Sequence, residues 1–230
     1  MEEISTKQNL NSNKIEKEVT KKEINSIKIN TKFIGKSIEQ YKIIDSTQLE
    51  IHRRIKQKNI ENGLIIMSER QTKGKGTHGR IWHTDEGNNI AFSLYVETNC
   101  VYQKLDGITI EIAKTILNVF KKVYHIDLQI KEPNDIVYNR KKIGGILTEA
   151  KVLKDKVKYL VIGIGINTNK QEFSEDIKEI ATSIKKEFNI NVDNILIIEE
   201  FCKEFEELLL KIVNGDGDFD NFYNKNKYLI

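Results

Sequence analysis

The chain has 230 residues, of which 39% are hydrophobic and 31% are charged, so it is long enough for one sizeable domain with a packed core. Its net charge of only +3 argues against a nucleic-acid groove or a polybasic membrane patch. Two cysteines, Cys100 and Cys202, are too few for a disulfide framework and favour a reducing cytoplasm. No apolar run is long enough to span a bilayer, and the N terminus lacks a secretory signal pattern.

The start of the chain differs in composition from the rest. Residues 1–30 are rich in Lys, Glu, Asn, Ser and Gln, with sparse isoleucines, and this composition predicts a flexible N-terminal arm. The arm shows no helix–turn–helix pattern, so we expect no DNA-binding module there. The main folded domain is therefore expected over residues 31–230.

The first predicted elements of that domain are a strand and a helix. Tyr41 to Asp45 reads as a strand, and Thr47 and Glu50 have the spacing of a capping box at the start of a helix. A helix N terminus also presents free N–H groups to an anionic or polar ligand. Ser46 and Thr47 are thus candidates both for capping the helix and for contacting a ligand.

A basic, glycine-rich loop follows a short buried strand predicted over Leu64 to Met67. Residues 74–79 match Gly-x-Gly-x-x-Gly, but the residues after them read as loop, whereas a dinucleotide fingerprint opens a helix. The partner motifs of a protein kinase are missing, and Gly79-Arg80 does not supply the end of a P-loop. The backbone N–H groups of such a loop can wrap a phosphate, and long irregular loops are often functional lids.

Three more elements have clear periodicity. Ile90 to Val96 alternates as a strand, and Asp106 to Tyr124 has the apolar face of a helix that packs across the sheet. Apolar residues between positions 196 and 212 define a second amphipathic helix, with Asp193 or Asn194 as its cap.

The only proline, Pro133, lies in a segment that reads as consecutive short strands. Leu128 to Lys131, Ile136 to Tyr138 and Ile143 to Leu147 are the predicted strands. The last contains two adjacent glycines, which in a strand often mark a close approach to the backbone. Lys131, at a strand end beside them, is a candidate anion site; an ordinary hairpin with an exposed lysine is the alternative.

A β-branched run from Val157 to Asn169 predicts a central strand. Gly163 and Gly165 are two residues apart, so their missing side chains would clear one face of that strand. Together with Gly144 or Gly145 on a neighbouring strand they predict a flat floor for a ligand. Close packing of a helix on the sheet is the alternative explanation.

Three motifs, in this order, resemble those of biotin–protein ligases. They are the glycine loop ending at Trp82, the pair Lys-x-Pro-Asn-Asp and Lys-Lys-Ile-Gly-Gly-Ile-Leu-Thr-Glu within 131–149, and Gly-Ile-Gly-Ile-Asn at 163–167. The resemblance covers roughly residues 31–215 and is to the catalytic domain of biotin–[acetyl-CoA-carboxylase] ligases and holocarboxylase synthetases, in a form without the N-terminal DNA-binding domain. Too few residues remain beyond it for the small SH3-like barrel that many biotin ligases carry.

The resemblance implies an α/β (α+β) fold of the class II synthetase-like type, with a mixed β-sheet packed by helices on one face. It implies ATP-dependent ligation of biotin, through biotinyl-5′-AMP, to a lysine of a biotin carboxyl carrier domain, with Mg²⁺ held mainly by phosphates and not by protein ligands. The implied enzyme is cytoplasmic, with no nucleic-acid or membrane partner, and a homodimer is compatible with it. A lipoate–protein ligase is the alternative, as is a catalytically inactive relative that binds biotin or a carrier domain.

The resemblance also implies a set of site residues. Those for biotin are Ser46, Thr47, Gln71, Gly74, Lys75, Lys131, Gly145, Gly163 and Gly165. Those for ATP are Lys75, Arg80, Trp82, Asn134, Lys142 and Asn167. Because both half-reactions build negative charge at one carboxyl–phosphate junction, a lysine aimed there stabilises the transition state. We assign this catalytic role to Lys131, with Arg80 on the phosphates.

Besides Lys75, which replaces an arginine with another cation, the chain departs from the family pattern at three positions. Gln48 replaces an asparagine, Thr77 an arginine and Glu132 a tryptophan. Loss of a buried guanidinium at Thr77 removes a charge-assisted contact worth ~1.5–3 kcal/mol, so we expect the acyl-adenylate to be held less tightly. Glu132 either pairs with Lys131 and weakens its field or points to solvent.

Overall fold

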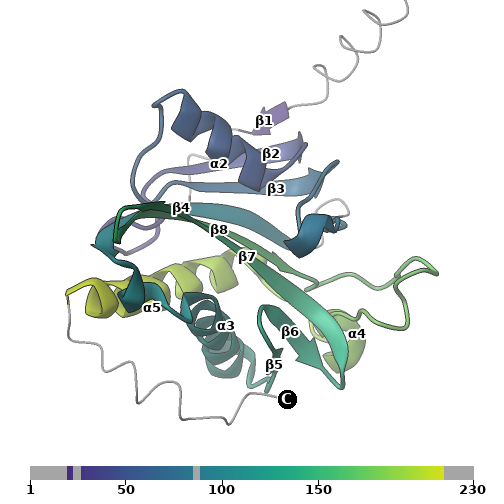
Figure 1. Ribbon diagram of the computed structural model, residues 1–230. Helices are drawn as coiled ribbons and strands as arrows, with labels where there is room; N and C mark the ends of the chain where they lie inside the picture. Colours follow the sequence, from purple (N-terminus) through teal and green to yellow (C-terminus); the bar gives the residue numbers. More distant parts are fainter. Residues whose placement is uncertain (1–19, 23–26, 85–88, 215–230) are drawn as a thin grey trace, which may run out of the picture.

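A mixed, eight-stranded sheet forms the centre of the molecule in the computed structural model, which describes residues 20–22, 27–84 and 89–214 (Figure 1). The strand order is β1-β2-β3-β4-β8-β7-β6-β5, in which β2 and β3 are parallel and every other neighbouring pair is antiparallel. The strands are β1 (Thr20–Lys22), β2 (Ile38–Ile44), β3 (Ile65–Gln71), β4 (Ile90–Val101), β5 (Gln129–Lys131), β6 (Asp135–Tyr138), β7 (Lys141–Leu153) and β8 (Lys156–Ile166).

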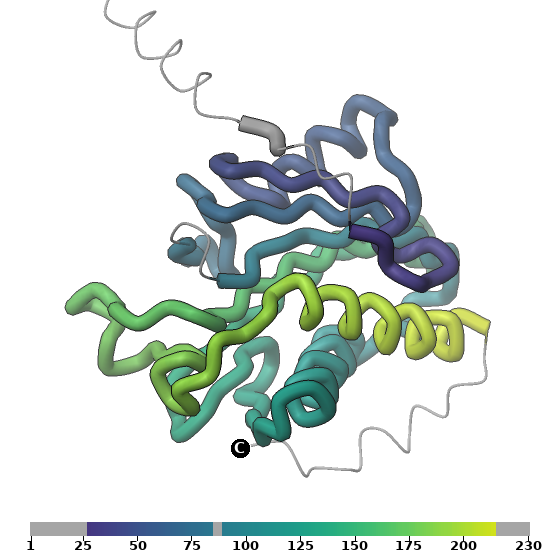
Figure 2. The backbone as a smooth tube through the Cα atoms, turned by 180° about the vertical axis from the view of Figure 1, so that it is seen from behind, coloured from purple at the N-terminus to yellow at the C-terminus, as the bar shows by residue number. Residues whose placement is uncertain are grey.

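Helices cover both faces of this sheet. They are α2 (Thr47–Lys56), α3 (Ile108–Tyr124), α4 (Ile184–Phe188) and α5 (Asn194–Asn214), with 3-10 turns η2 (Thr77–Gly79) and η3 (Tyr102–Leu105). The long helices α3 and α5 lie side by side on one face (Figure 2), and α2 contacts β3, β4 and β8 from the other. The α/β class with a mixed sheet is confirmed, but the prediction that the helices lie on one face fails for α2, which packs on the opposite face.

Two apolar clusters follow from the period-2 alternation of the strands. Ile65, Phe92 and Ile162 point to the α3–α5 face, where Phe201 packs edge-on against Phe92 with ring centroids 5.8 Å apart. The smaller cluster lies under α2 and contains Tyr41, Ile44, Ile51, Leu64, Ile66, Tyr95 and Val161. Adjacent residues such as Ile65 and Ile66 therefore stabilise opposite faces of one sheet.

The two long helices begin close to where their periodicity predicts, but the start of α2 differs. At α5, the Asp193 carboxylate accepts hydrogen bonds from the N–H groups of Ile195 and Leu196, at 3.0 and 3.1 Å, which confirms the predicted cap. The predicted capping box of Thr47 and Glu50 is wrong. Ser46 is the N-cap residue and makes no side-chain capping bond, and the carboxylate of Glu50 instead pairs with arginines of the next turn.

The folded domain begins before residue 31, contrary to the sequence-based boundary. Strand β1, at Thr20–Lys22, pairs antiparallel with β2, and Ile29 is buried in the main core. The rest of the predicted arm, residues 1–19 and 23–26, lies outside the described residues.

A buried carboxylate fastens this early part of the domain to α5. Glu206 is only 5% exposed, and its two oxygens accept hydrogen bonds from three consecutive backbone N–H groups, those of Lys32, Phe33 and Ile34. The bonds to Phe33 and Ile34 are both 2.8 Å long. One side chain of α5 thus accepts hydrogen bonds from three backbone N–H groups of the turn that leads into β2.

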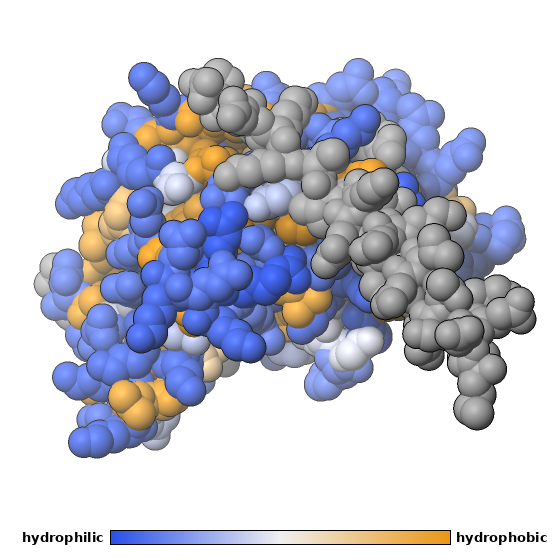
Figure 3. Space-filling view, turned by 90° about the horizontal axis from the view of Figure 1, so that it is seen from above, coloured by the Kyte–Doolittle hydropathy of each residue, from blue (hydrophilic) through white to orange (hydrophobic). Residues whose placement is uncertain are grey.

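The outer surface is mainly polar. Seen from above in Figure 3, hydrophilic side chains cover most of the visible face, with apolar ones between them. Within the described part of the chain, no helix is long and apolar enough to cross a membrane. Cys100 and Cys202 are both buried and form no disulfide, and burial raises the pKa of the Cys202 thiol well above its ordinary value.

Candidate functional site

A cavity of about 320 Å³ lies between the N terminus of α2, the glycine loop, strands β7 and β8, and the segment 170–181. This volume falls in the range of small-molecule sites. Most of the predicted site residues meet there: Ser46, Thr47, Gln71, Lys75, Arg80, Trp82, Asn134, Lys142, Gly145, Gly163, Gly165 and Asn167 line the wall. Lys131 and Gly74 are outside this lining.

Glycines form the floor of the cavity, as the spacing predicts. A Cβ at Gly163 would lie 2.7 Å from Gln48 Oε1, and one at Gly165 would lie 2.3 Å from Trp82 Cε2. Gly163 therefore admits a side chain of α2, in line with the helix-packing alternative, and Gly165 admits the indole of the glycine loop. A Cβ at Gly145 would lie 3.1 Å from the Nζ atom of Lys142.

One end of the cavity is closed to bulk water yet built from uncharged polar groups. Ser46, Thr47, Gln48 and Ser93 are each at most 3% exposed. The Ser46 hydroxyl is buried and has no hydrogen-bond partner within the described structure. Because an unsatisfied buried hydroxyl costs about 1–3 kcal/mol, this end is suited to a ligand with polar, uncharged groups.

The N terminus of α2 is tied to β3 through Gln71. The N–H of Thr47 donates to Gln71 Oε1 at 2.9 Å, and Gln71 Nε2 donates to Thr84 Oγ1 at 3.2 Å. Thr47 Oγ1 lies 2.8 Å from the hydroxyl of Ser93. Ser93 was not predicted from the sequence; its position in an alternating strand gave no signal beyond facing one side of the sheet.

The opposite end of the floor carries the ammonium group of Lys142. Its Nζ donates to Asp135 Oδ1 at 2.5 Å and lies 5.8 Å from the centroid of the Trp82 ring. The backbone of Lys142 is held on both sides, since its N–H donates to the carbonyl of Ile180 and its carbonyl accepts from the N–H of Thr182, both at 2.8 Å. Lys142 is therefore the strand lysine that reaches the floor.

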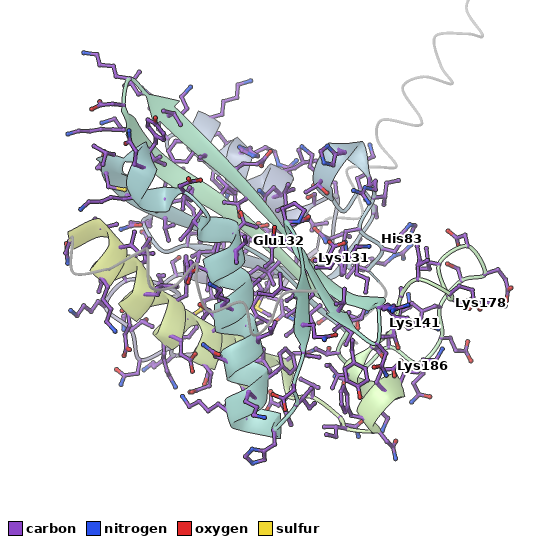
Figure 4. All side chains as sticks on the ribbon, turned by 60° about the horizontal axis from the view of Figure 1, so that its bottom comes forward. His83, Lys131, Glu132, Lys141, Lys178 and Lys186 are labelled. Carbon is purple, nitrogen blue, oxygen red and sulfur yellow. The ribbon has the colours of Figure 1, made fainter. Side chains whose placement is uncertain are left out.

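Lys131, to which the sequence analysis assigns the catalytic role, lies outside the lining of the cavity. Lys131 lies on β5, the edge strand, and is exposed. It pairs with Asp135, which pairs with Gly145, which pairs with Gly165, so two strand spacings of about 4.8 Å each separate Lys131 from Gly145. Figure 4 shows Lys131 with its exposed neighbour Glu132 on the segment of β5, away from Lys141 at the start of β7.

The glycine loop folds back on itself beside the floor. Lys75 bridges to Ile81, and the N–H of Trp82 donates to the carbonyl of Gly74 at 2.9 Å. A Cβ at Gly74 would lie 2.3 Å from the Trp82 carbonyl oxygen, so Gly74 permits this close approach instead of contacting the cavity as predicted. Lys75, Thr77 and Arg80 line both this cavity and an adjoining one of about 460 Å³ under the loop.

The segment 170–181 completes the wall with apolar side chains. Phe173, Ile177 and Ile180 line the cavity, and the ammonium groups of Lys170 and Lys186 lie 5.1 and 5.7 Å from the Phe173 ring. Sequence periodicity could not identify these residues, because the segment forms neither a long helix nor a strand. The side chain of Asn167 anchors its end by donating to the carbonyl of Thr182 at 3.2 Å.

The arrangement offers three chemically different regions along one floor. Gln48 covers Gly163 at the uncharged polar end, Trp82 covers Gly165, and Lys142 lies beside Gly145. Gly163 and Gly165 are about 7 Å apart along β8. A matching ligand has a polar, uncharged head, an apolar middle and an anionic end that the lysines and Arg80 can stabilise.

Known proteins share this fold. The Bacillus subtilis bifunctional ligase/repressor BirA is 33% identical over 175 residues, which cover 75% of this chain and 54% of that protein. The biotin protein ligase of Aquifex aeolicus, solved with biotin and ATP, superimposes with a TM-score of 0.70 at 28% identity, covering 85% of this chain and 79% of that one. The Leishmania major ligase solved with biotinyl-5-AMP gives 0.57 at 25% identity, with 80% and 83% covered.

The chain spans about half the length of the Bacillus relative. Residues 40–167, which include the start of α2, the glycine loop and the whole glycine floor, match the family described as the biotin/lipoate A/B protein ligase family. The segment that matches the family by sequence is also the one that forms the glycine floor of the cavity. The chain therefore belongs to the biotin/lipoate A/B protein ligase family.

Proposed function

We propose that this protein joins biotin to a lysine of a biotin carboxyl carrier domain, in the cytoplasm, using ATP. The observation that carries the proposal is that the two ends of the glycine floor differ in chemistry. The Ser46 hydroxyl, which has no hydrogen-bond partner within the described structure, lies at the closed polar end, and the Lys142 ammonium lies at the other end. Biotin has a ureido ring, an apolar chain and a carboxylate in that order. The Aquifex and Leishmania relatives were solved with biotin and ATP and with biotinyl-5-AMP, respectively.

The polar end also favours biotin over lipoate. A ureido group has two N–H donors and one carbonyl acceptor, which can pair with the Ser46 and Ser93 hydroxyls. The dithiolane ring of lipoate has no such groups, so it would leave the buried Ser46 hydroxyl unpaired at a cost of about 1–3 kcal/mol. The site would then select biotin because lipoate leaves a buried polar group of the protein unpaired. Such a loss discriminates between two ligands more strongly than the shape of an apolar pocket does.

In the first half-reaction a biotin carboxylate oxygen attacks the α-phosphorus of ATP, and the bond to the β-phosphate oxygen breaks to release pyrophosphate. In the second, the acceptor amine attacks the carbonyl carbon, the bond to AMP breaks, and the amine loses a proton. We assign Lys142 to the carboxyl–phosphate junction that both half-reactions share. Its ammonium group would stabilise the negative charge that develops there. Lys75 and Arg80 extend the positive field over the phosphates.

Mg²⁺ fits this scheme as an ion bound mainly through the phosphates of ATP, because it retains most of its waters and uses few protein ligands. The part of the chain that the structure describes contains no group of three or more metal-ligating side chains. When bound, the ion would neutralise phosphate charge. Positioning of the biotin carboxylate is left to Lys142.

ATP–pyrophosphate exchange by purified protein tests the function. With Mg²⁺ present, we expect exchange with biotin to exceed exchange with lipoate about tenfold, since the unpaired Ser46 hydroxyl costs on the order of 1–3 kcal/mol. Transfer of labelled biotin to a carrier domain completes the test. Exchange supported only by lipoate would assign the chain to the lipoate branch, and folded protein without exchange would favour an inactive binder.

Retention of the intermediate gives a separate prediction at Thr77. Thr77 lines the cavity between Lys75 and Arg80, where the family pattern has an arginine. We expect Thr77→Arg to slow the release of labelled biotinyl-AMP at least tenfold, because a guanidinium adds a charge-assisted contact to phosphate of ~1.5–3 kcal/mol. His78→Arg is the matched control, since His78 lines only the adjoining cavity; equal release rates in both variants would contradict the prediction.

A further inference from the structure

Gln48, one of the departures from the family pattern, lies at the centre of a hydrogen-bond chain that runs from the buried Ser93 to the partly exposed Glu149 and His52. Gln48 is 2% exposed, and its amide covers Gly163. Gln48 Nε2 donates to Glu149 Oε2 at 2.8 Å and to the carbonyl of Val161 at 3.3 Å. The same Glu149 oxygen lies 2.7 Å from Nε2 of His52, which is one helical turn after Gln48 on α2.

The carboxylate of Glu149 fixes which way this amide points. An ionised carboxylate only accepts hydrogen bonds, so the NH₂ group of Gln48 must face it and Oε1 must face Ser93. Hydrogen bonds from His52 and Gln48, with the nearby charge of Lys75, outweigh burial and hold the pKa of Glu149 below its usual range. Glu149 is therefore an obligate acceptor at neutral pH.

The fixed amide in turn fixes the hydroxyl of Ser93. Ser93 Oγ donates its one proton to Gln48 Oε1 at 2.9 Å, so toward Thr47 and the cavity it can only accept. Glu149 and His52 do not line the main cavity among the residues described, whereas Gln48 and Ser93 do. Glu149 does line the adjoining cavity under the glycine loop, but its hydrogen-bonded route to the polar end of the main cavity runs through Gln48 and Ser93.

We propose that Glu149, held by His52, is a positioning residue that locks the Gln48–Ser93 pair so that the closed end of the cavity selects a ligand N–H donor. This inference rests on the proposed function, because it assigns that donor to one of the two ring N–H groups of biotin. The closed end then discriminates by hydrogen-bond direction as well as by shape.

Calorimetric binding without ATP tests this assignment. The probes are biotin and the two cyclic carbamate analogues in which one or the other ring N–H is replaced by oxygen. For the wild-type protein we expect one analogue to bind at least tenfold more weakly than biotin, because two acceptors then face each other. In Glu149→Gln, whose amide can turn either way and release Gln48 to flip, that ratio should fall at least fivefold.

The control is Glu61→Gln, which removes an exposed carboxylate and should leave the ratio unchanged. In exchange assays, Glu149→Gln should raise the KM for biotin about tenfold with kcat changed less than threefold, a split that general loss of structure would not give. If Glu149→Gln does not fold, His52→Phe replaces it, with the ratio expected to fall at least twofold. His52→Gln, which keeps a donor to Glu149, should restore the wild-type ratio.

The outcomes separate the two levels of the proposal. Wild-type protein that binds biotin, together with a folded Glu149→Gln or His52→Phe variant that keeps the wild-type ratio, would overturn the positioning role and leave the proposed function intact. Wild-type protein that does not bind biotin would overturn the proposed function and this inference with it.

Discussion

Replacing Lys142 by alanine is expected to lower biotin-dependent pyrophosphate exchange by about a hundred- to a thousandfold, the effect typical of removing one preorganised group that stabilises developing charge. The ammonium of Lys142 lies beside Gly145 at the floor, and backbone bonds to Ile180 and Thr182 hold the residue on both sides. Its pairing with Asp135 keeps the charge in place before an anion arrives. The measurement is the exchange rate at saturating biotin and ATP.

Two neighbouring lysines provide the controls. Lys141→Ala removes an equal charge one residue away, where Nζ lies 3.5 Å from the carbonyl of Lys178 and outside the cavity lining. Lys131→Ala tests the sequence-based assignment directly. Both variants should keep exchange within about fivefold of wild type, as expected for exposed or outlying charges at working salt concentrations. A loss in Lys131→Ala as large as that in Lys142→Ala would contradict the structural assignment.

Replacing Glu206 by alanine is expected to lower the free energy of unfolding by at least about 3 kcal/mol. The variant leaves the N–H groups of Lys32, Phe33 and Ile34 without their carboxylate acceptor, and of these three bonds only the one to Ile34 is fully buried. Hydrogen bonds to a charged group contribute about 1.5–3 kcal/mol each, and less where the donor is reached by water. The turn they form leads directly into β2. Urea unfolding followed by circular dichroism measures the change as a shift of the midpoint at constant slope.

Glu207→Ala is the matched control, because Glu207 is the next residue of α5 and is exposed. Both variants gain the same helix propensity, so the difference between them isolates the three hydrogen bonds. The control should change the free energy of unfolding by less than about 0.5 kcal/mol. A difference between the variants of under about 1 kcal/mol would mean that the turn finds other partners when the carboxylate is removed.

The sequence by itself determined the α/β class, the two long helices, the central glycine strand and the meeting of three motifs at one site. Local patterns suffice for the helices and the glycine strand, whereas the α/β class and the shared site were implied by the resemblance to biotin–protein ligases. Helical periodicity predicts α3 and α5, and Gly163 and Gly165 share a face wherever a strand forms, because the side chains of a strand alternate. The glycine loop was likewise recognisable as a loop because no helical pattern follows Gly79.

Only the tertiary structure decided which lysine reaches the glycine floor and which hydrogen bonds connect the residues of the polar end. Lys131 and Lys142 both stand at strand ends, and strand order, not local pattern, places β5 at the sheet edge and β7 beside β8. Ser93, Glu149 and Glu206 act through residues far away in the chain, such as Gln48, 101 positions before Glu149, and Lys32, 174 positions before Glu206. Hydrogen-bond partners brought together by folding leave no periodic signal in the sequence, because each depends on the register of the whole sheet.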